Sequence, residues 1–220
     1  MRIAYVNEYS QAPKNQLIFD ILKDVVKVYG HEIVNYGQYS PEDDRLTYNE
    51  VGLINALILN GKAADFVITT CGTGMGVMLA SNSFPGVVCG HAQDPSDTFL
   101  FSQINGGNAI AIPLAKGFGW GGEENVRYMF EKLFIKEPGI GYPPGNEKSR
   151  KSQQYNAKVL NKMKTVTHRS MLEILDDIDK EVLDHVLRRK SFRQQYLADC
   201  KDEVLKAKVI EKIQELKYEI

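Results

Sequence analysis

The stretch Asp65-Phe-Val-Ile-Thr-Thr-Cys-Gly-Thr-Gly-Met-Gly-Val-Met-Leu-Ala-Ser-Asn82 joins a short apolar run to three alternate glycines. The apolar run ends at Cys71, and helix-forming residues follow the glycines. This order predicts a buried strand that turns tightly into a helix. Ligands of parallel α/β sheets bind at the carboxyl ends of strands, where helix N-termini offer free N–H groups. Cys71 and the glycine turn are therefore the first candidates for a functional site.

The segments on both sides of this stretch repeat the alternation of strand and helix through residue 137. Apolar residues between Leu17 and Val26 recur at three- and four-residue spacing, which predicts a helix that ends near Gly30. The expected strands are Arg2–Val6, Glu32–Asn35, Asp65–Thr70, Gly86–Cys89 and Asn108–Ile112. The expected helices are Asn15–Tyr29, Tyr48–Asn60, Met75–Ser81, Ser96–Gln103 and Glu123–Ile135. This pattern is typical of an α/β fold with a five-stranded, doubly wound parallel sheet.

The chain changes character after residue 137. Glycine and proline crowd residues 137–145, so we expect a loop over 138–151. Residues 152–220 are expected to form a helical C-terminal extension, with one long amphipathic helix over Met171–Leu187 and a last helix over Val204–Leu216. These helices are too few to bury a core alone, so they should pack on the body or on a second subunit.

Composition excludes several classes of protein. No apolar run approaches the length of about 18 residues that a membrane span needs, and the N-terminus does not resemble a signal peptide, so we expect a cytoplasmic protein without membrane contact. The three cysteines form no CxxC pair, which argues against a disulfide framework and a cysteine zinc site. Residues 147–220 hold 17 of the 27 Lys and Arg but also 13 of the 28 Asp and Glu. The basic residues alternate with acidic ones on helix faces, so no nucleic-acid partner is expected.

Two other interpretations of the glycine turn remain open at this point. Gly72, Gly74 and Gly76 are spaced GxGxG instead of GxGxxG, and they follow the third strand, so a dinucleotide fingerprint is weakly supported. The glycines could also serve only close packing, with Cys71 a small buried hydrophobic residue.

The sequence from Cys71 to Gly90, CGTGMGVMLASNSFPGVVCG, resembles the active-site strand and loop of the RpiB/LacA/LacB family of aldose–ketose isomerases. The similarity extends over residues 1–137 and includes Gly30–Gly37 and Gln103–Asn108. It implies a Rossmann-like three-layer sandwich, no metal and no cofactor, and a small anionic sugar as substrate. It also implies a homodimer, or a dimer of dimers, whose C-terminal segments embrace the partner.

The chemistry of such an enzyme can be matched to the residues of the turn. Moving a carbonyl between C1 and C2 needs a base, a group that serves the two oxygens, and donors that stabilise an enediolate. Cys71 resembles the family's base, and N–H donors at a helix N-terminus favour its thiolate. The Thr73 hydroxyl could serve the oxygens, and the N–H groups of Gly72, Gly74 and Gly76 could bind the enediolate.

Two pairs of positions depart from the family pattern. Sugar-phosphate members carry an Asp-His pair after the first strand, which positions the sugar and contacts phosphate, whereas this chain has Glu8 and Tyr9. They carry a ring-opening His before an Asn-Asp pair, whereas here Ile104 precedes Asn105. Isoleucine cannot transfer protons. His91 is then either a replacement ring opener or a histidine with a structural role.

The departures favour a substrate with an accessible open-chain carbonyl and a carboxylate. Lys148 and Arg150 are the cations left where the family binds phosphate. One branch of similar length resembles this description, the ketol-isomerases of 4-deoxy-5-hexosulose uronate. A ribose 5-phosphate or galactose 6-phosphate isomerase with rearranged contacts is the alternative, and a sugar-binding sensor without catalysis is a further one.

The remaining polar residues receive simpler interpretations. Asn105 and Asn108 are expected to bind substrate hydroxyls, although they could also simply turn the chain. Trp120 is expected at an interface. The residues interpreted as surface positions are His31, Asp43, Asp44, Arg45, His168 and His185.

Overall fold

The computed structural model describes all of residues 1–220 and contains one parallel sheet. The sheet has the strand order β2-β1-β3-β5-β4, and every neighbouring pair is parallel. The strands are β1 (Arg2–Asn7), β2 (Glu32–Asn35), β3 (Phe66–Cys71), β4 (Cys89–His91) and β5 (Ala109–Pro113). The predicted five-stranded parallel sheet is therefore confirmed.

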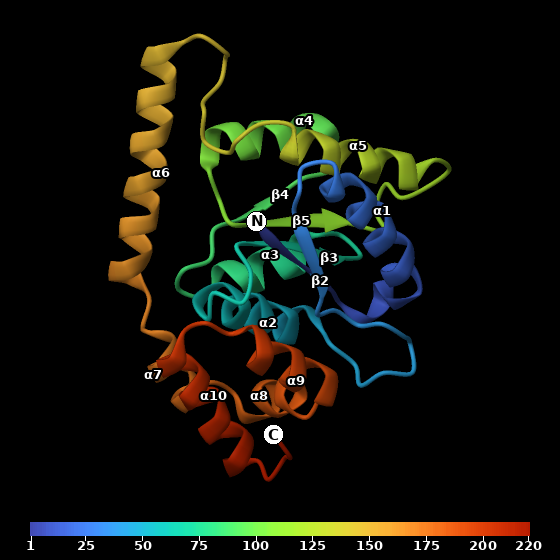
Figure 1. Cartoon of the computed structure of the whole chain (residues 1–220), viewed down its shortest axis with the longest axis vertical. Helices are drawn as coiled ribbons and strands as arrows, with labels where there is room; N and C mark the ends of the chain where they lie inside the picture. The colour runs from blue at the N-terminus through green and yellow to red at the C-terminus, as the bar shows by residue number, and fades with distance from the viewer.

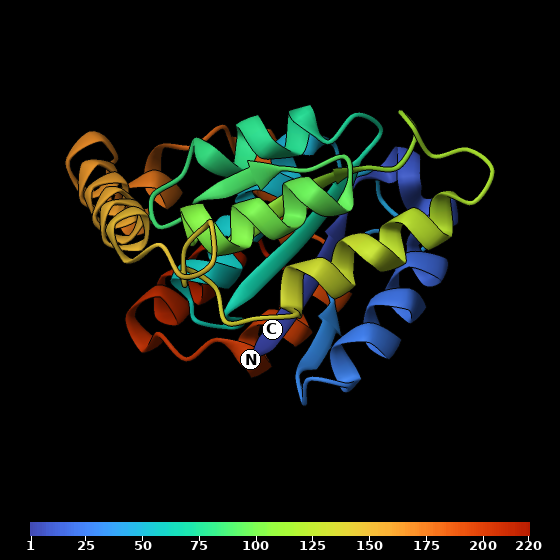
Figure 2. The same cartoon turned by 90° about the horizontal axis from the view of Figure 1, so that it is seen from above.

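Helices cover both faces of the sheet, as the sequence alternation predicts (Figures 1 and 2). Ile3, Tyr5 and Ile68 point to one face and pack against α1 (Asn15–Lys27) and α5 (Gly122–Phe134), with α4 (Pro95–Leu100) beside α5. Their neighbours along the strands point to the other face, which α2 (Tyr48–Asn60) and α3 (Met75–Asn82) cover. The strands β1, β3 and β5 are buried on both faces and are mostly apolar, which is the usual composition of a parallel sheet.

The order of the strands creates one topological switch point in the sheet. The chain leaves strand β1 for β2 on one side and then crosses to the central strand β3 on the other side. The carboxyl ends of β1 and β3 are adjacent, and their following loops diverge to opposite layers. Such a switch point is where open α/β sheets bind their ligands.

Local sequence explains how α2 begins and how closely it approaches α3. The Thr47 N–H donates to Glu50 Oε2 at 2.7 Å, and the Thr47 side chain caps the first turn in return. A reciprocal cap of this kind contributes about 1 kcal/mol. Gly52 lies so close to Ala80 that an added Cβ would come within 2.6 Å of the alanine Cβ. Glycine at this position lets the two helices pack backbone to backbone.

The C-terminal extension has two parts with different packing. The helices α7 (Met171–Asp177), α8 (Lys180–Leu187), α9 (Lys190–Asp199) and α10 (Glu203–Glu215) pack below α2, and their apolar residues belong to the same core cluster as one face of the sheet. The 21-residue helix α6 (Glu147–Thr167) has no buried residue and stands beside the body (Figure 1). None of the helices carries an apolar stretch long enough to cross a bilayer.

Several expected boundaries in the extension differ from the structure. The single helix expected over Met171–Leu187 is wrong, because Ile178 is extended and Asp179 starts α8 by accepting the N–H of Glu181 at 2.9 Å. Helix α9 was not expected. Helix α6 begins at residue 147, inside the stretch expected to be a loop, because Asn146 caps it.

The fourth strand is also displaced from the expected Gly86–Cys89. The Asn108 side chain accepts the Val88 N–H at 2.8 Å and donates to the Gly86 carbonyl at 2.7 Å, so these residues bind a side chain instead of joining the ladder. The strand forms only over Cys89–His91, and His91 is its last residue. The helix expected over Ser96–Gln103 consists of α4 and a π-helical turn, η2 (Phe101–Asn105).

Candidate active site

Cys71 is the last residue of β3, and the turn after it folds back onto its sulfur. The Gly74 N–H donates to the Cys71 Sγ at 3.1 Å. Gly74 has a φ of +73°, a conformation that side chains rarely adopt. The turn therefore needs glycine at this position to aim an N–H donor at the sulfur.

A cleft of about 400 Å³ opens in front of Cys71 at the switch point of the sheet. The loop after β1, the loop before α2 and the glycine turn form its walls, which contain no histidine. The lining residues are Glu8, Tyr9, Ser10, Arg45, Thr47, Tyr48, Cys71, Gly72, Thr73 and Gly76. The structure thus places Glu8, Tyr9, Cys71, Thr73 and two of the predicted glycines in one cleft.

The two residues after β1 have different environments. Glu8 is 5% exposed and caps the short 3-10 helix η1 (Tyr9–Lys14), with its Oε2 accepting the Ser10 N–H at 2.9 Å. The Ser10 hydroxyl also donates to Glu8 Oε1. Tyr9 is exposed and lines the cleft. Glu8 is therefore held in place as a carboxylate acceptor, while Tyr9 is accessible to a ligand.

Arg45 is a site residue that the sequence interpretation placed on the surface. It is exposed, but its guanidinium lies over the Tyr9 ring, with the central carbon 3.8 Å from the ring centroid. Its Nη2 donates to the Tyr9 hydroxyl at 2.8 Å. Among the lining residues it is the only cation. No motif marks Arg45, because the loop that carries it into the cleft has no regular periodicity.

The rest of the turn is fixed by neighbouring loops. The Gly72 carbonyl accepts the Lys116 N–H at 2.9 Å, and the Thr73 hydroxyl accepts the Met75 N–H at 3.3 Å. An added Cβ at Gly76 would come within 2.9 Å of the Tyr48 ring. The third glycine of the motif therefore makes room for an aromatic side chain of the cleft wall.

His91 lies outside the cleft, against the back of the turn. Its Nε2 is 2.9 Å from the Thr73 carbonyl, which can only accept, so this nitrogen carries the proton. An added Cβ at Gly74 would come within 2.7 Å of the same nitrogen. In this arrangement the ring supports the turn through the Thr73 backbone, and His91 itself is not among the residues that line the cleft.

Four predicted binding residues are not brought to Cys71 within this chain. Asn105 and Asn108 precede β5 and lie at the amino edge of the sheet, opposite the cleft. Lys148 and Arg150 lie on the first turns of α6, where Arg150 pairs with Glu147 at 2.7 Å and lines another hollow. If these residues meet a substrate at Cys71, they must come from another copy of the chain.

The three histidines interpreted as surface residues are half-buried. His185 Nδ1 is 3.2 Å from Glu50 Oε1 and ties α8 to α2, and His168 Nε2 is 3.3 Å from the Asn82 carbonyl. Burial and the N-terminal charge hold the pKa of His31 below its ordinary value. Trp120 is fully exposed, so the interface expected for it is not within the chain.

The molecule has larger hollows, but they lie away from the glycine turn. Two of them, of about 430 and 550 Å³, share Met1 and Phe66 and open at the amino edge of the sheet. Cys89 is buried beside α3, and burial raises the pKa of its thiol to about 12. The cleft at Cys71 is therefore the one that combines a thiol, a carboxylate, hydroxyl groups and a cation.

Comparison with known proteins agrees with this fold. The family model described as Ribose/Galactose Isomerase matches residues 3–137. The chain is 33% identical over 83 residues to ribose-5-phosphate isomerase B of Escherichia coli (strain K12), and the match covers 38% of this chain and 54% of the relative. The chain thus spans about half the length of the curated relative it matches.

Two solved structures resemble nearly the whole chain. A 4-deoxy-L-threo-5-hexosulose-uronate ketol-isomerase, complexed with a tartrate, is 47% identical with a TM-score of 0.91, over 98% of this chain and 100% of that one. A ribose-5-phosphate isomerase of the LacAB/RpiB type from Vibrio parahaemolyticus is 42% identical with a TM-score of 0.90, over 98% and 99% of the two chains. Both structures are named as sugar isomerases, and both include the C-terminal extension. With the family match over more than half of its length, the chain belongs to the ribose/galactose isomerase family.

Proposed function

We propose that this chain interconverts an aldose and a ketose through an enediolate, with Cys71 as the base. The observation that carries the proposal is the position of Cys71 at the switch point, with the Gly74 N–H 3.1 Å from its sulfur. A donor at this distance stabilises negative charge on sulfur, and the thiolate is the form that accepts a proton.

The proposed reaction transfers two protons. It needs no external oxidant or reductant, because all electrons stay in the sugar. The Cys71 thiolate takes the proton from C2 of the aldose, and the electron pair of that C–H bond forms the C1–C2 double bond of the enediolate. The thiol then returns the proton to C1, while a proton passes from O2 to O1, so that C2 becomes the carbonyl carbon. The Thr73 hydroxyl, which lines the cleft, is the proposed group for the transfer between oxygens.

We propose 4-deoxy-L-threo-5-hexosulose uronate as the substrate. The cleft contains no histidine that could open a sugar ring, and Tyr9 stands where a phosphate-binding histidine is expected. The relative named as a ketol-isomerase of this uronate shares 47% of its residues with this chain over its full length. That relative was solved with tartrate, a small hydroxy acid, which supports a carboxylate as the anionic group.

A sugar phosphate is the second candidate, because the Vibrio parahaemolyticus ribose-5-phosphate isomerase is 42% identical over nearly all of both chains. The test is to compare kcat/KM for the uronate, ribose 5-phosphate and galactose 6-phosphate on the wild-type protein. We expect a strong preference for the uronate. A preference for either phosphate would replace the proposed substrate.

A non-catalytic sugar sensor would use the same cleft without turnover. Solvent deuterium distinguishes the two, because a base that exchanges its proton introduces deuterium at C1 of the product. We expect incorporation with the wild type and none with Cys71→Ala. Binding of the uronate without either isomerisation or exchange would favour the sensor.

We also propose that the chain is a homodimer, or a dimer of dimers, in which α6 contacts the partner. Tyr155, Met163 and Val166 lie on one stripe of α6 and are 67%, 56% and 79% exposed. An amphipathic helix that leaves its apolar stripe in water is stabilised when a second surface covers it. A symmetric partner would also bring a second α6, with Lys148 and Arg150, toward the body.

We propose the cytoplasm as the compartment. All three cysteines are free and buried, with no disulfide between them. Unpaired thiols in a chain of this size fit a reducing compartment.

A further inference from the structure

The Cys71 cleft has one cation, Arg45, and its charge is not used within the chain. The salt bridges of the structure do not include Arg45, and its one side-chain hydrogen bond goes to the neutral Tyr9 hydroxyl. The neighbouring carboxylates, Asp43 and Asp44, instead face Arg189 and Arg188 of the C-terminal extension, at 4.0 and 3.8 Å. A guanidinium that is excluded from ion pairs in this way keeps N–H donors for a ligand.

Tyr9 holds this guanidinium at the mouth of the cleft. The aromatic ring supports its flat face at 3.8 Å, and the hydroxyl accepts one N–H at 2.8 Å. The Tyr9 backbone N–H also donates to the Leu46 carbonyl at 2.9 Å, next to Arg45 in the chain. The Tyr9 side chain therefore fixes the guanidinium of Arg45, and the Tyr9 backbone fixes the main chain beside it.

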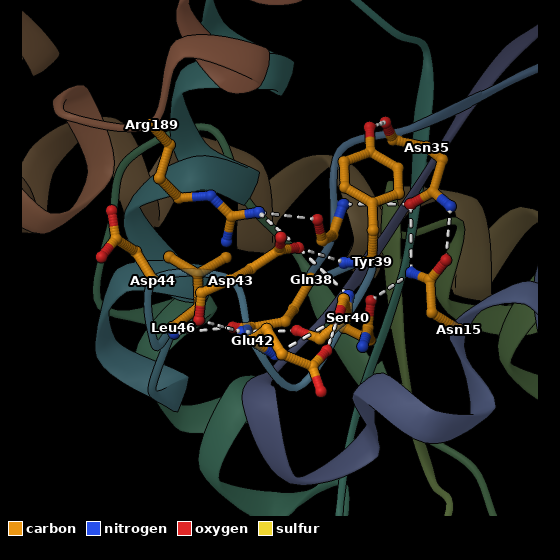
Figure 3. A network of polar contacts seen from close by, with 12 residues as sticks. Asn15, Asn35, Gln38, Tyr39, Ser40, Glu42, Asp43, Asp44, Leu46 and Arg189 are labelled. Carbon is orange, nitrogen blue, oxygen red and sulfur yellow. Dashed lines mark hydrogen bonds and ion pairs between the residues drawn. The ribbon is translucent and has the colours of Figure 1, made fainter.

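A buried polar network fixes the loop on the other side of Arg45 (Figure 3). Gln38 is 1% exposed, and its amide donates to the Asp43 carbonyl at 2.9 Å while its oxygen accepts the Leu46 N–H at 2.9 Å. Arg189 reaches in from the C-terminal extension and donates to the Gly37 carbonyl at 3.1 Å. The Asp43 carboxylate accepts the Tyr39 N–H at 3.0 Å. The backbone on both sides of Arg45 is thus held by bonds that do not involve the Arg45 side chain.

We propose that Arg45 binds the carboxylate of the substrate and makes this cleft select uronates. The proposal rests on the proposed sugar isomerisation at Cys71 and identifies the residue that selects the substrate. A guanidinium binds a carboxylate through two parallel N–H donors. Because Tyr9 already fixes the Arg45 side chain, little conformational entropy is lost when the substrate binds. The net charge of the cleft favours a singly charged group, because Glu8 lines the same cleft and would repel a phosphate dianion more than a carboxylate.

The test compares two substrates that differ only in the anionic group. They are 4-deoxy-5-hexosulose uronate and its neutral analogue, in which a hydroxymethyl group replaces the carboxylate. Arg45→Met should lower kcat/KM for the uronate by about 10- to 150-fold, through KM more than kcat, and leave the neutral analogue unchanged. Arg45→Lys should lose less activity than Arg45→Met, because lysine keeps the positive charge but not the two parallel N–H donors of the guanidinium. Arg127→Met, a half-buried residue of α5 that does not line the cleft, is the control and should change the kinetics of neither substrate.

Three outcomes decide the proposal. Equal losses on both substrates, or no loss on the uronate, would overturn it. A selective loss in Arg150→Met but not in Arg45→Met would assign the carboxylate to α6 instead. Calorimetry of uronate binding to the Cys71→Ala variant tests the proposed isomerase function separately. Binding there that depends on Arg45, without turnover by the wild type, would contradict the reaction and retain the assignment of Arg45.

Discussion

The backbone N–H of Gly74 lies 3.1 Å from the Cys71 sulfur, and His91 fills the space where a side chain at residue 74 would stand. Gly74→Ala would place a Cβ 2.7 Å from His91 Nε2 and in a conformation with φ of +73°. The turn must shift, so its donors would leave the sulfur and the enediolate. We expect kcat to fall by about 10²-fold or more, which is the usual effect of losing one such donor.

The matched control for this change is Gly119→Ala. Gly119 has open space around the position of its Cβ and no positive φ. Steady-state kinetics should therefore show wild-type rates for Gly119→Ala. Unchanged kcat in Gly74→Ala would contradict the prediction that displacing this donor slows the reaction.

Replacement of Cys71 tests the base itself. Cys71→Ser should lower kcat by about 10²-fold or more, because a serine hydroxyl is a poor base at neutral pH. The side chain is small and lies at the edge of the core, so the thermal midpoint should stay close to that of the wild type. Full activity in the serine variant would place the base elsewhere.

Alkylation with iodoacetamide should separate two of the buried cysteines. Cys71 lines the cleft, and the Gly74 N–H donates to its sulfur. Burial raises the pKa of Cys89 to about 12, so this thiol keeps its proton throughout the neutral range. The reagent attacks thiolates, and at pH 8 it should modify Cys71 in step with the loss of activity and leave Cys89 unmodified. Peptide mass spectrometry measures both sites, and modification of Cys89 ahead of Cys71 would contradict the assignment.

The sequence predicts the body of the fold well because each of its signals is local. The strand Phe66–Cys71 consists of apolar and β-branched residues, and the apolar residues of α1 recur at helical spacing. The strand β4 is missed by three residues because its boundary depends on Asn108, twenty residues away from Val88, which binds the backbone there. A contact between distant residues leaves no periodicity in the chain.

The candidate site is predicted in part for the same reason. Cys71 and its glycines form a contiguous motif, and Glu8 and Tyr9 follow a predicted strand, so both groups could be placed at the carboxyl edge. Arg45 could not be placed there, because its position depends on contacts of Gln38 and Arg189 with an irregular loop. Asn105 and Asn108 were expected to bind substrate hydroxyls, and within one chain the direction of β5 puts them at the edge opposite Cys71.

The exposed stripe of α6 leads to a prediction about assembly. The other side of the helix is already attached to the body, since Lys164 donates to the carbonyls of Asn82 and Phe84 at 3.0 and 3.2 Å. Tyr155 and Val166 face away from this attachment, because residues eleven apart lie on nearly the same side of a helix and Lys164 lies on roughly the opposite side from both. The double variant Tyr155→Glu/Val166→Glu puts two charges on the stripe and should convert a dimer into a folded monomer in sedimentation velocity.

Asn161→Glu provides the control for charge alone. Asn161 is exposed on α6 and its side chain bonds only within the helix, off the stripe, so this variant should remain dimeric. Circular dichroism should show the same helix content in both variants, because neither change touches the core. If the double variant is monomeric and also loses activity, a partner copy completes the cleft; if it is monomeric and active, the cleft is complete within one chain. A wild type that is already monomeric, or a double variant that still dimerises, would exclude α6 as the contact.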